Sequence, residues 1–123
     1  MQEVILSQEE LEERLAYWQE KLRLRDWIIT IRIVREKEMD PNRAAEISWT
    51  LSKKMASVRI LDPIDYPDGL MAMQDMENSL VHELLHLHFA PIHEDAHDRE
   101  HYEVFEEQAI ESITHGLIAV ARK

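Results

Sequence analysis

The stretch VHELLHLH, residues 81–88, decides how the rest of this sequence is interpreted. It holds two histidines, His82 and His86, four positions apart, and Glu83 directly follows the first. Leucines occupy most of the positions between them, which is typical of a helix that is largely buried. Ionisable side chains on a buried helix need a partner of opposite charge or a metal ion. The stretch therefore predicts a helix whose polar face contacts a group of opposite charge or a metal ion.

The pattern H-E-x-x-H predicts that this helix binds a metal ion. Side chains four residues apart lie on one helix face, so the rings of His82 and His86 can bind one zinc ion at roughly 2.0–2.1 Å. Glu83 is offset from that face and can reach a water on the metal. Zinc lowers the pKa of such a water towards about 7, and the carboxylate can pass its proton to a leaving amine. The alternative interpretation is a surface helix with paired His and Glu.

A zinc site of this kind needs a third protein ligand, and a predicted C-terminal helix offers three acidic residues. Glu106 lies in the apolar stripe of that helix, where a charge is unfavourable unless a cation neutralises it. We therefore expect Glu106 to be the ligand. Glu107, Glu111, a histidine or water are the alternatives. Glu107 and Glu111 are like charges four residues apart, an arrangement that is more often solvated.

The chain before the motif predicts one helix and a small sheet. Ser7 and Glu10 have the spacing of a capping box at the start of a helix. The apolar stripe of that helix consists of Leu11, Leu15, Trp18 and Leu22. Alternating apolar residues then predict strands at 27–34, 47–51 and 54–61, with the last two forming a hairpin.

The chain around and after the motif predicts two further helices. The helical period predicts a helix over 70–89 that ends before Pro91. A polar connection, with or without a helical turn of its own, follows at 91–98, and Asp98 caps a last helix from about 99 to 121. The order is an N-terminal helix, a three-stranded sheet, the H-E-x-x-H helix and a C-terminal helix, which is an α+β fold.

Length and composition restrict the class of protein. The 123 residues are 45% hydrophobic with two Gly and four Pro, which indicates one compact domain over residues 1–123. The net charge of −11 repels phosphate backbones and argues against nucleic acid as a partner. We expect no membrane span and no secretory signal, and hence a cytoplasmic protein. The absence of cysteine excludes disulfides and thiolate metal sites. Neither charge nor motif specifies an oligomeric state.

On its motif and order of elements, the chain resembles small zincin metallopeptidases of the gluzincin type. HELLH (82–86) looks like a zincin active-site helix, and EEQA (106–109) is similar to the glutamate-bearing helix of gluzincins. The layout is similar to minimal ImmA/IrrE-type and phage-borne zincin domains. In zincins an edge strand of the sheet binds the substrate backbone as an added strand, and the segment 54–61 would take that role here.

This resemblance implies a zinc-dependent peptidase that acts on a peptide or protein. His82, His86 and Glu106 would bind Zn²⁺, and Glu83 would be the general base. No oxyanion stabiliser is assigned, and the candidates are Tyr102, His101 and His115.

Two other functions are compatible with the motif. One is a catalytically silent binding or regulatory domain that a metal ion stabilises. The other is a metal-dependent ribonuclease of the YbeY type, because HELLHLHFAPIH (82–93) is similar to that family's three-histidine motif. In this chain the last histidine is displaced by one residue and Glu83 stands where a Gly is expected. The acidic charge also opposes RNA binding.

A second histidine pattern lies beyond the motif. His93, His97 and His101 are spaced by four residues and would form a stripe on a helix. The stripe is either a second metal site or, as is more common for such mixed runs, a solvated polar turn.

Overall fold

The computed structural model describes residues 2–67 and 72–123. Within them it has three α-helices and a three-stranded sheet, which confirms the predicted α+β class. The elements are α1 (Gln8–Lys21), β1 (Ile28–Val34), β2 (Ala45–Thr50), β3 (Met55–Leu61), α2 (Met76–Asp95) and α3 (Arg99–Ala121). Short 3-10 turns at Glu36–Glu38, Leu51–Lys53 and Pro63–Asp65 connect them.

Helix α1 begins where the capping box predicted. The backbone N–H of Glu10 donates to the Ser7 hydroxyl at 3.1 Å, and the Ser7 N–H donates to the Glu10 carboxylate at 2.9 Å. Of the predicted stripe, Leu11, Leu15 and Trp18 are buried. The local signals and the tertiary packing therefore agree for this helix.

The sheet has the order β1–β3–β2. β2 pairs with β3 in antiparallel fashion, which confirms the predicted hairpin, and β1 pairs with β3 in parallel. The expectation that the segment 54–61 is an edge strand was wrong, because β3 has a hydrogen-bonded neighbour on both sides. The edge strand that packs on α2 is β2. The alternation of apolar residues predicts strands but not their order in the sheet. Here the chain passes from β1 to β2 at the other edge, and β3 then forms between them.

Helix α2 begins at Met76, and the Asp75 side chain accepts a hydrogen bond from the Asn78 N–H at 3.0 Å. The predicted start at residue 70 lies outside the described residues, and the described residues 72–75 precede the helix. The predicted end before Pro91 was wrong, because α2 continues to Asp95.

Tertiary contacts explain why α2 continues past Pro91. Proline removes one backbone hydrogen bond and clashes with the preceding turn, so an isolated helix would end there. Here the Trp49 indole N–H donates to the Glu94 carboxylate at 3.3 Å, and the Trp49 and His93 rings meet edge to face. The sheet thus holds the last turn of α2 in place, and the predicted polar connection 91–98 shrinks to three residues.

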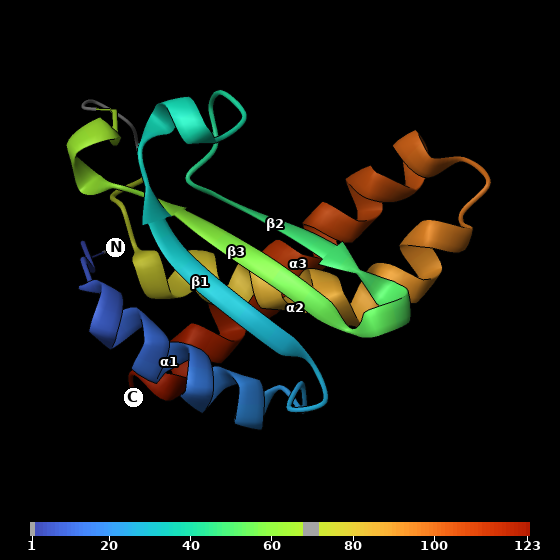
Figure 1. Cartoon of the computed structure of the whole chain (residues 1–123), viewed down its shortest axis with the longest axis horizontal. Coiled ribbons are helices and arrows are strands. Elements are labelled where there is room, and N and C mark those ends of the chain that lie inside the picture. Colours follow the sequence, from blue (N-terminus) through green and yellow to red (C-terminus); the bar gives the residue numbers. More distant parts are fainter. Residues whose placement is uncertain (1, 68–71) are drawn as a thin grey trace.

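Helix α3 begins as predicted after Asp98, whose side chain accepts from the His101 N–H at 3.2 Å. α2 and α3 form an antiparallel pair, since His93 lies 3.5 Å from Glu103 near the turn and Asp75 pairs with Arg122 at the far end. In Figure 1 the sheet passes in front of both helices. No helix in the described ranges is long and apolar enough to cross a membrane.

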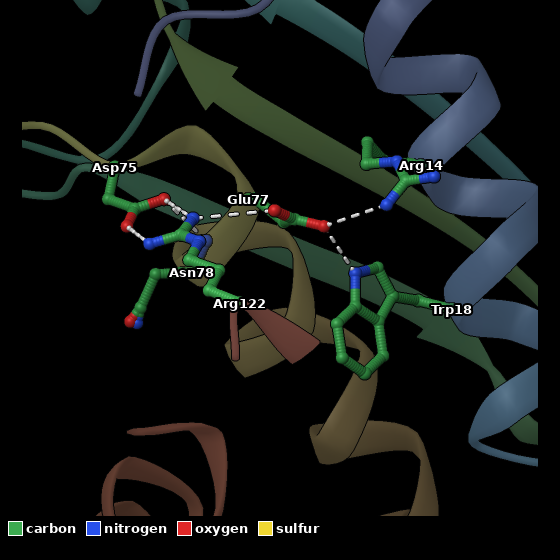
Figure 2. Close-up of polar contacts among 6 residues, drawn as sticks. All are labelled: Arg14, Trp18, Asp75, Glu77, Asn78 and Arg122. Carbon is green, nitrogen blue, oxygen red and sulfur yellow. Dashed lines mark hydrogen bonds and ion pairs between the residues drawn. The ribbon is translucent and has the colours of Figure 1, made fainter. Parts of the chain in front are cut away.

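A buried carboxylate ties the three helices together, as Figure 2 shows. The Trp18 indole N–H donates to Glu77 at 2.8 Å, and Arg14 lies 3.4 Å from the same oxygen. The other oxygen of Glu77 accepts from Arg122 at 3.3 Å. Arg122 also donates to both oxygens of Asp75, at 2.7 and 3.0 Å. The interior of α1 and the C-terminal end of α3 are therefore anchored at the start of α2.

Candidate metal centre

The pairing of α2 with α3 brings three donor side chains together. The Nε2 atom of His82 lies 3.2 Å from one oxygen of Glu107, and the Nε2 atom of His86 lies 3.0 Å from the other. One donor atom of each residue, a ring nitrogen or a carboxylate oxygen, lies within 4.8 Å of the other two. In the part of the chain that the structure describes, this is the one group of three or more such donors.

These residues fit a zinc ion. Nitrogen and oxygen donors lie about 2.0–2.1 Å from zinc, so two donors at a tetrahedral ion are roughly 3.4 Å apart. The separations of 3.2 and 3.0 Å between the histidine nitrogens and Glu107 are close to that value. Two imidazoles and one carboxylate are also a donor set of catalytic zinc sites, which leave a fourth position open.

A second pair of carboxylates lies on the opposite side of the two rings. The Nδ1 atom of His82 is 2.7 Å from Glu111, and the Nδ1 atom of His86 is hydrogen-bonded to Glu106 at 2.9 Å. A carboxylate on Nδ1 holds the proton there and leaves the Nε2 lone pair free for a metal ion. Both rings are therefore oriented with Nε2 towards Glu107.

Glu106, the third ligand expected from the sequence, is not in the group of three donors. Its side chain is buried, and its second oxygen lies 3.5 Å from the Nδ1 atom of His93. Burial and the nearby Glu106 carboxylate raise the pKa of Tyr102, which packs beside it. One oxygen of this buried carboxylate is hydrogen-bonded to His86, and the other has no hydrogen-bond partner among the described residues. Glu107 provides the third donor of the group.

The carboxylates change the protonation of the histidines. Burial alone would lower the pKa of His82 and of His86, but Glu107 and the other nearby carboxylates outweigh it, so that both pKa values are raised. The same contacts hold the pKa of Glu107 well below its usual range. Without a metal ion, the cluster thus favours charged imidazole rings around an ionised Glu107.

Glu83 has a different environment from the other carboxylates of the site. It is 8% exposed, and burial raises its pKa, while the nearby His82 and His86 act in the opposite direction. It lines the same cavity as the two histidines. A carboxylate with a raised pKa beside a metal centre is suited to accept a proton near neutral pH.

The site opens into a cavity of about 1340 Å³. Ala45, Ile47 and Trp49 of β2 line one wall, and residues of α2 and α3, among them His82 and His86, line the other. The edge strand and the candidate metal centre therefore face one common space.

The other expected site residues are scattered. Among the candidate oxyanion donors, His115 lines the cavity, whereas the exposed His101 and the half-buried Tyr102 are not among the described lining residues. His93, His97 and His101 do not form a group of metal donors within the described chain, because α2 ends between the first and the second of them.

The spacing of Glu107 and Glu111 in the sequence already indicated that they could contact His82 and His86. His82 and His86 are four residues apart, and so are Glu107 and Glu111. On two antiparallel helices, equal spacings of this kind place each histidine opposite an acid. Once the pairing of α2 with α3 is known, the like charges of the two glutamates are explained by the cations that face them.

Comparisons of the chain with protein-family models, with curated proteins and with solved structures found no match.

Proposed function

We propose that this protein is a zinc-dependent peptidase. The observation that carries the proposal is the grouping of His82, His86 and Glu107, whose donor atoms lie within 4.8 Å of one another, with the buried Glu83 in the same open cavity. This is the arrangement that metal-assisted hydrolysis needs: three ligands, an open side and a separate base. Cytoplasmic location stays a prediction.

The residues of the site have distinct roles in this proposal. A zinc ion would supply Lewis acidity, which acidifies water and polarises a carbonyl group. Glu83 takes a proton from the attacking water and delivers it to the amine that leaves when the C–N bond breaks. Glu111 and Glu106 hold the imidazole rings of His82 and His86 by their Nδ1 atoms. A peptide in extended form would pair with β2, the edge strand that lines the cavity.

The test combines metal content with substitution of Glu83. We expect the purified protein to carry one zinc ion per chain and to hydrolyse peptides. Glu83→Gln should keep the zinc and lower kcat by about 10²–10⁴-fold, because the amide cannot accept the proton. A protein that binds no zinc, or a Glu83→Gln variant that hydrolyses peptides at the normal rate, contradicts the proposal.

A second candidate is a metal-stabilised binding domain without turnover. The proposed ligands come from both α2 and α3, so a metal ion would also hold these two helices together. In that case removal of the metal by a chelator unfolds the protein. In a peptidase with a catalytic metal, the chelator abolishes hydrolysis while the anchor of α3 through Arg122 keeps the chain folded. Melting curves with and without chelator separate the two.

A further inference from the structure

The two arginines that line the cavity differ in their ion pairing. Six of its described lining residues are acidic and two are arginines, Arg43 and Arg122. Arg122 is engaged by the carboxylates of Asp75 and Glu77, as Figure 2 shows. Its charge is therefore neutralised within the fold.

Arg43, the other arginine at the cavity, has no such partner among the described residues. It is exposed, and it forms no ion pair or side-chain hydrogen bond within residues 2–67 and 72–123, although its charge acts to lower the pKa of the nearby Glu46 and Glu83. The nearby Glu46 is paired with Arg59 at 2.7 Å and accepts the N–H of Asp40 at 2.9 Å. An arginine at the wall of an acidic cavity, without an ion pair to the described residues, is available to an anionic group of a ligand.

Backbone contacts place Arg43 at a defined end of the cavity. The next residue, Ala44, accepts a hydrogen bond from the Leu61 N–H at 2.9 Å, and the Leu61 carbonyl accepts from the Gln74 side chain at 2.7 Å. Arg43 thus lies beside the start of α2. The other end of β2 lies at the last turn of α2, where Trp49 contacts Glu94. β2 and α2 run in the same direction in Figure 1. His82 and His86 lie in the interior of α2, between its two ends.

This placement sets the direction of a bound peptide. A strand that adds to β2 in antiparallel orientation, the more stable and more common pairing, directs its C-terminal part towards Arg43. Its N-terminal part then lies at the end formed by Glu94 and Glu103, which is acidic. The charges at both ends agree with this orientation, since a peptide carries its amino group at one end and its carboxylate at the other.

We propose that Arg43 binds a carboxylate of the substrate on the C-terminal side of the cleaved bond, and so selects peptides with an acidic side chain or a free C-terminus there. This inference rests on the proposed peptidase function. His82 lies six residues (82 − 76) after the start of α2, which is roughly 9 Å along the helix. An extended peptide covers that distance in about three residues. The carboxylate should therefore lie within about three residues of the cleaved bond.

The first experiment identifies cleavage sites by mass spectrometry after the zinc-loaded protein has acted on a mixed peptide library. We expect Asp, Glu or a free C-terminus to be enriched about tenfold over Lys and Arg within three residues after the cleaved bond.

Arg43→Gln should remove this preference for acidic residues, and Arg43→Glu should reverse it towards Lys and Arg. Lys53→Gln, which removes the same charge from the turn after β2, is the matched control and should keep it. Acid and amide forms of the cleaved peptides distinguish a side-chain carboxylate from the C-terminus.

A binding experiment keeps the inference testable without turnover. In the zinc-loaded Glu83→Gln variant, fluorescence anisotropy compares labelled six-residue peptide pools that end in Asp-Asp with a free acid or in Lys-Lys with an amide. We expect about fivefold tighter binding of the acidic pool, and the reverse after Arg43→Glu is added. Equal binding of the two pools, or an acidic preference that survives Arg43→Glu, overturns the role of Arg43.

A uniform fall in kcat for all peptides at constant KM in Arg43→Gln also overturns the role of Arg43, since that result indicates a role at the reacting carbonyl. Failure to cut any peptide counts against the peptidase function instead.

Discussion

Each imidazole of the candidate metal centre has carboxylates on both of its nitrogens. Glu107 faces the Nε2 atoms of His82 and His86, whereas Glu111 and Glu106 face the Nδ1 atoms. Glutamates that are close in sequence thus have different tasks, and the ring nitrogen that each one meets decides which task it has. Carboxylates on Nδ1 orient a ligand, and a carboxylate on the Nε2 side can itself bind the metal.

Substitution of the acids separates these tasks. Loss of an orienting carboxylate weakens metal affinity by about 10–100-fold, and loss of a direct ligand weakens it further. We therefore expect Glu107→Ala to lose more zinc affinity than Glu106→Gln, measured by competition with a chelating dye. Glu100→Gln, an exposed acid at the start of α3, is the control and should bind zinc normally. The opposite order would return the ligand role to Glu106, as the sequence pattern had suggested.

The protonation of the two histidines predicts how zinc binding depends on pH. Their pKa values are raised above 6.5 in the folded, metal-free protein. A raised pKa gives stability that is fully present below the unfolded pKa and is lost as the pH rises through the folded pKa. Zinc needs neutral rings, so protons compete with it at low pH.

We therefore expect the chelator-treated protein to lose this contribution between about pH 6.5 and the raised pKa values of the two histidines. The difference in melting temperature between zinc-loaded and metal-free protein should grow from about pH 5.5 to about pH 8. His97→Gln changes an exposed histidine outside the group of donors and should preserve this trend. A difference that does not change with pH would show that no protons are displaced by the metal.

At the scale of elements, the last turn of α2 is held by its neighbours against the tendency of its own sequence. Pro91 lies inside the helix, yet the chain remains helical to Asp95. The contacts of His93 and Glu94 with Trp49 come from β2, which is distant in sequence. The same contacts place one end of the edge strand against α2 and so define one end of the cavity.

Replacement of this proline should stabilise the protein. Proline inside a helix is about 3 kcal/mol less favourable than alanine, and less than that near a helix end. We expect Pro91→Ala to raise the free energy of unfolding by about 1–2 kcal/mol in urea titrations. Pro63 occupies the first turn of a 3-10 helix, where a missing N–H has no effect, so Pro63→Ala should give no gain. A Pro91→Ala variant that is less stable would indicate that the proline shapes the turn into α3.

For the whole molecule, both ends of the chain meet the start of α2. Val4 exchanges backbone hydrogen bonds with Gln74 and Met76 at 2.9 Å, and Arg122 binds Asp75 and Glu77. Residues that are up to 118 positions apart (122 − 4) therefore converge there. This junction lies at one end of the cavity and holds α3 in the register that brings Glu107 to His82 and His86.

Glu77 is the most sensitive point of this junction. Removal of one partner from a buried ionic network leaves the others without compensation, which typically costs about 3–5 kcal/mol. Because Glu77 is 9% exposed, we expect Glu77→Gln to lower the free energy of unfolding by about 3 kcal/mol, followed by tryptophan fluorescence in urea. Glu13→Gln on the exposed side of α1 should change it by less than about 0.5 kcal/mol. Equal stability of the two variants would mean that the network does not hold the helices.

Much of the fold was predictable from local patterns. The capping box at Ser7 and the alternation in β3 act over a few residues, and burial follows them directly. The spacing of His82, Glu83 and His86 likewise needs only the geometry of one helix to place two rings on one face.

What the sequence by itself determined is therefore local: the α+β order of elements, the helix starts at Ser7 and Asp98, and the pair of histidines with its neighbouring acid. Only the tertiary structure decided that β2 is the edge strand at the site, that α2 passes Pro91, and that Glu107 lies where Glu106 was expected. The physical reason is that these outcomes depend on contacts between residues far apart in the chain. Neighbouring glutamates on a helix differ by about 100° in direction, and only the packing of α3 on α2 decides which of them faces the histidines.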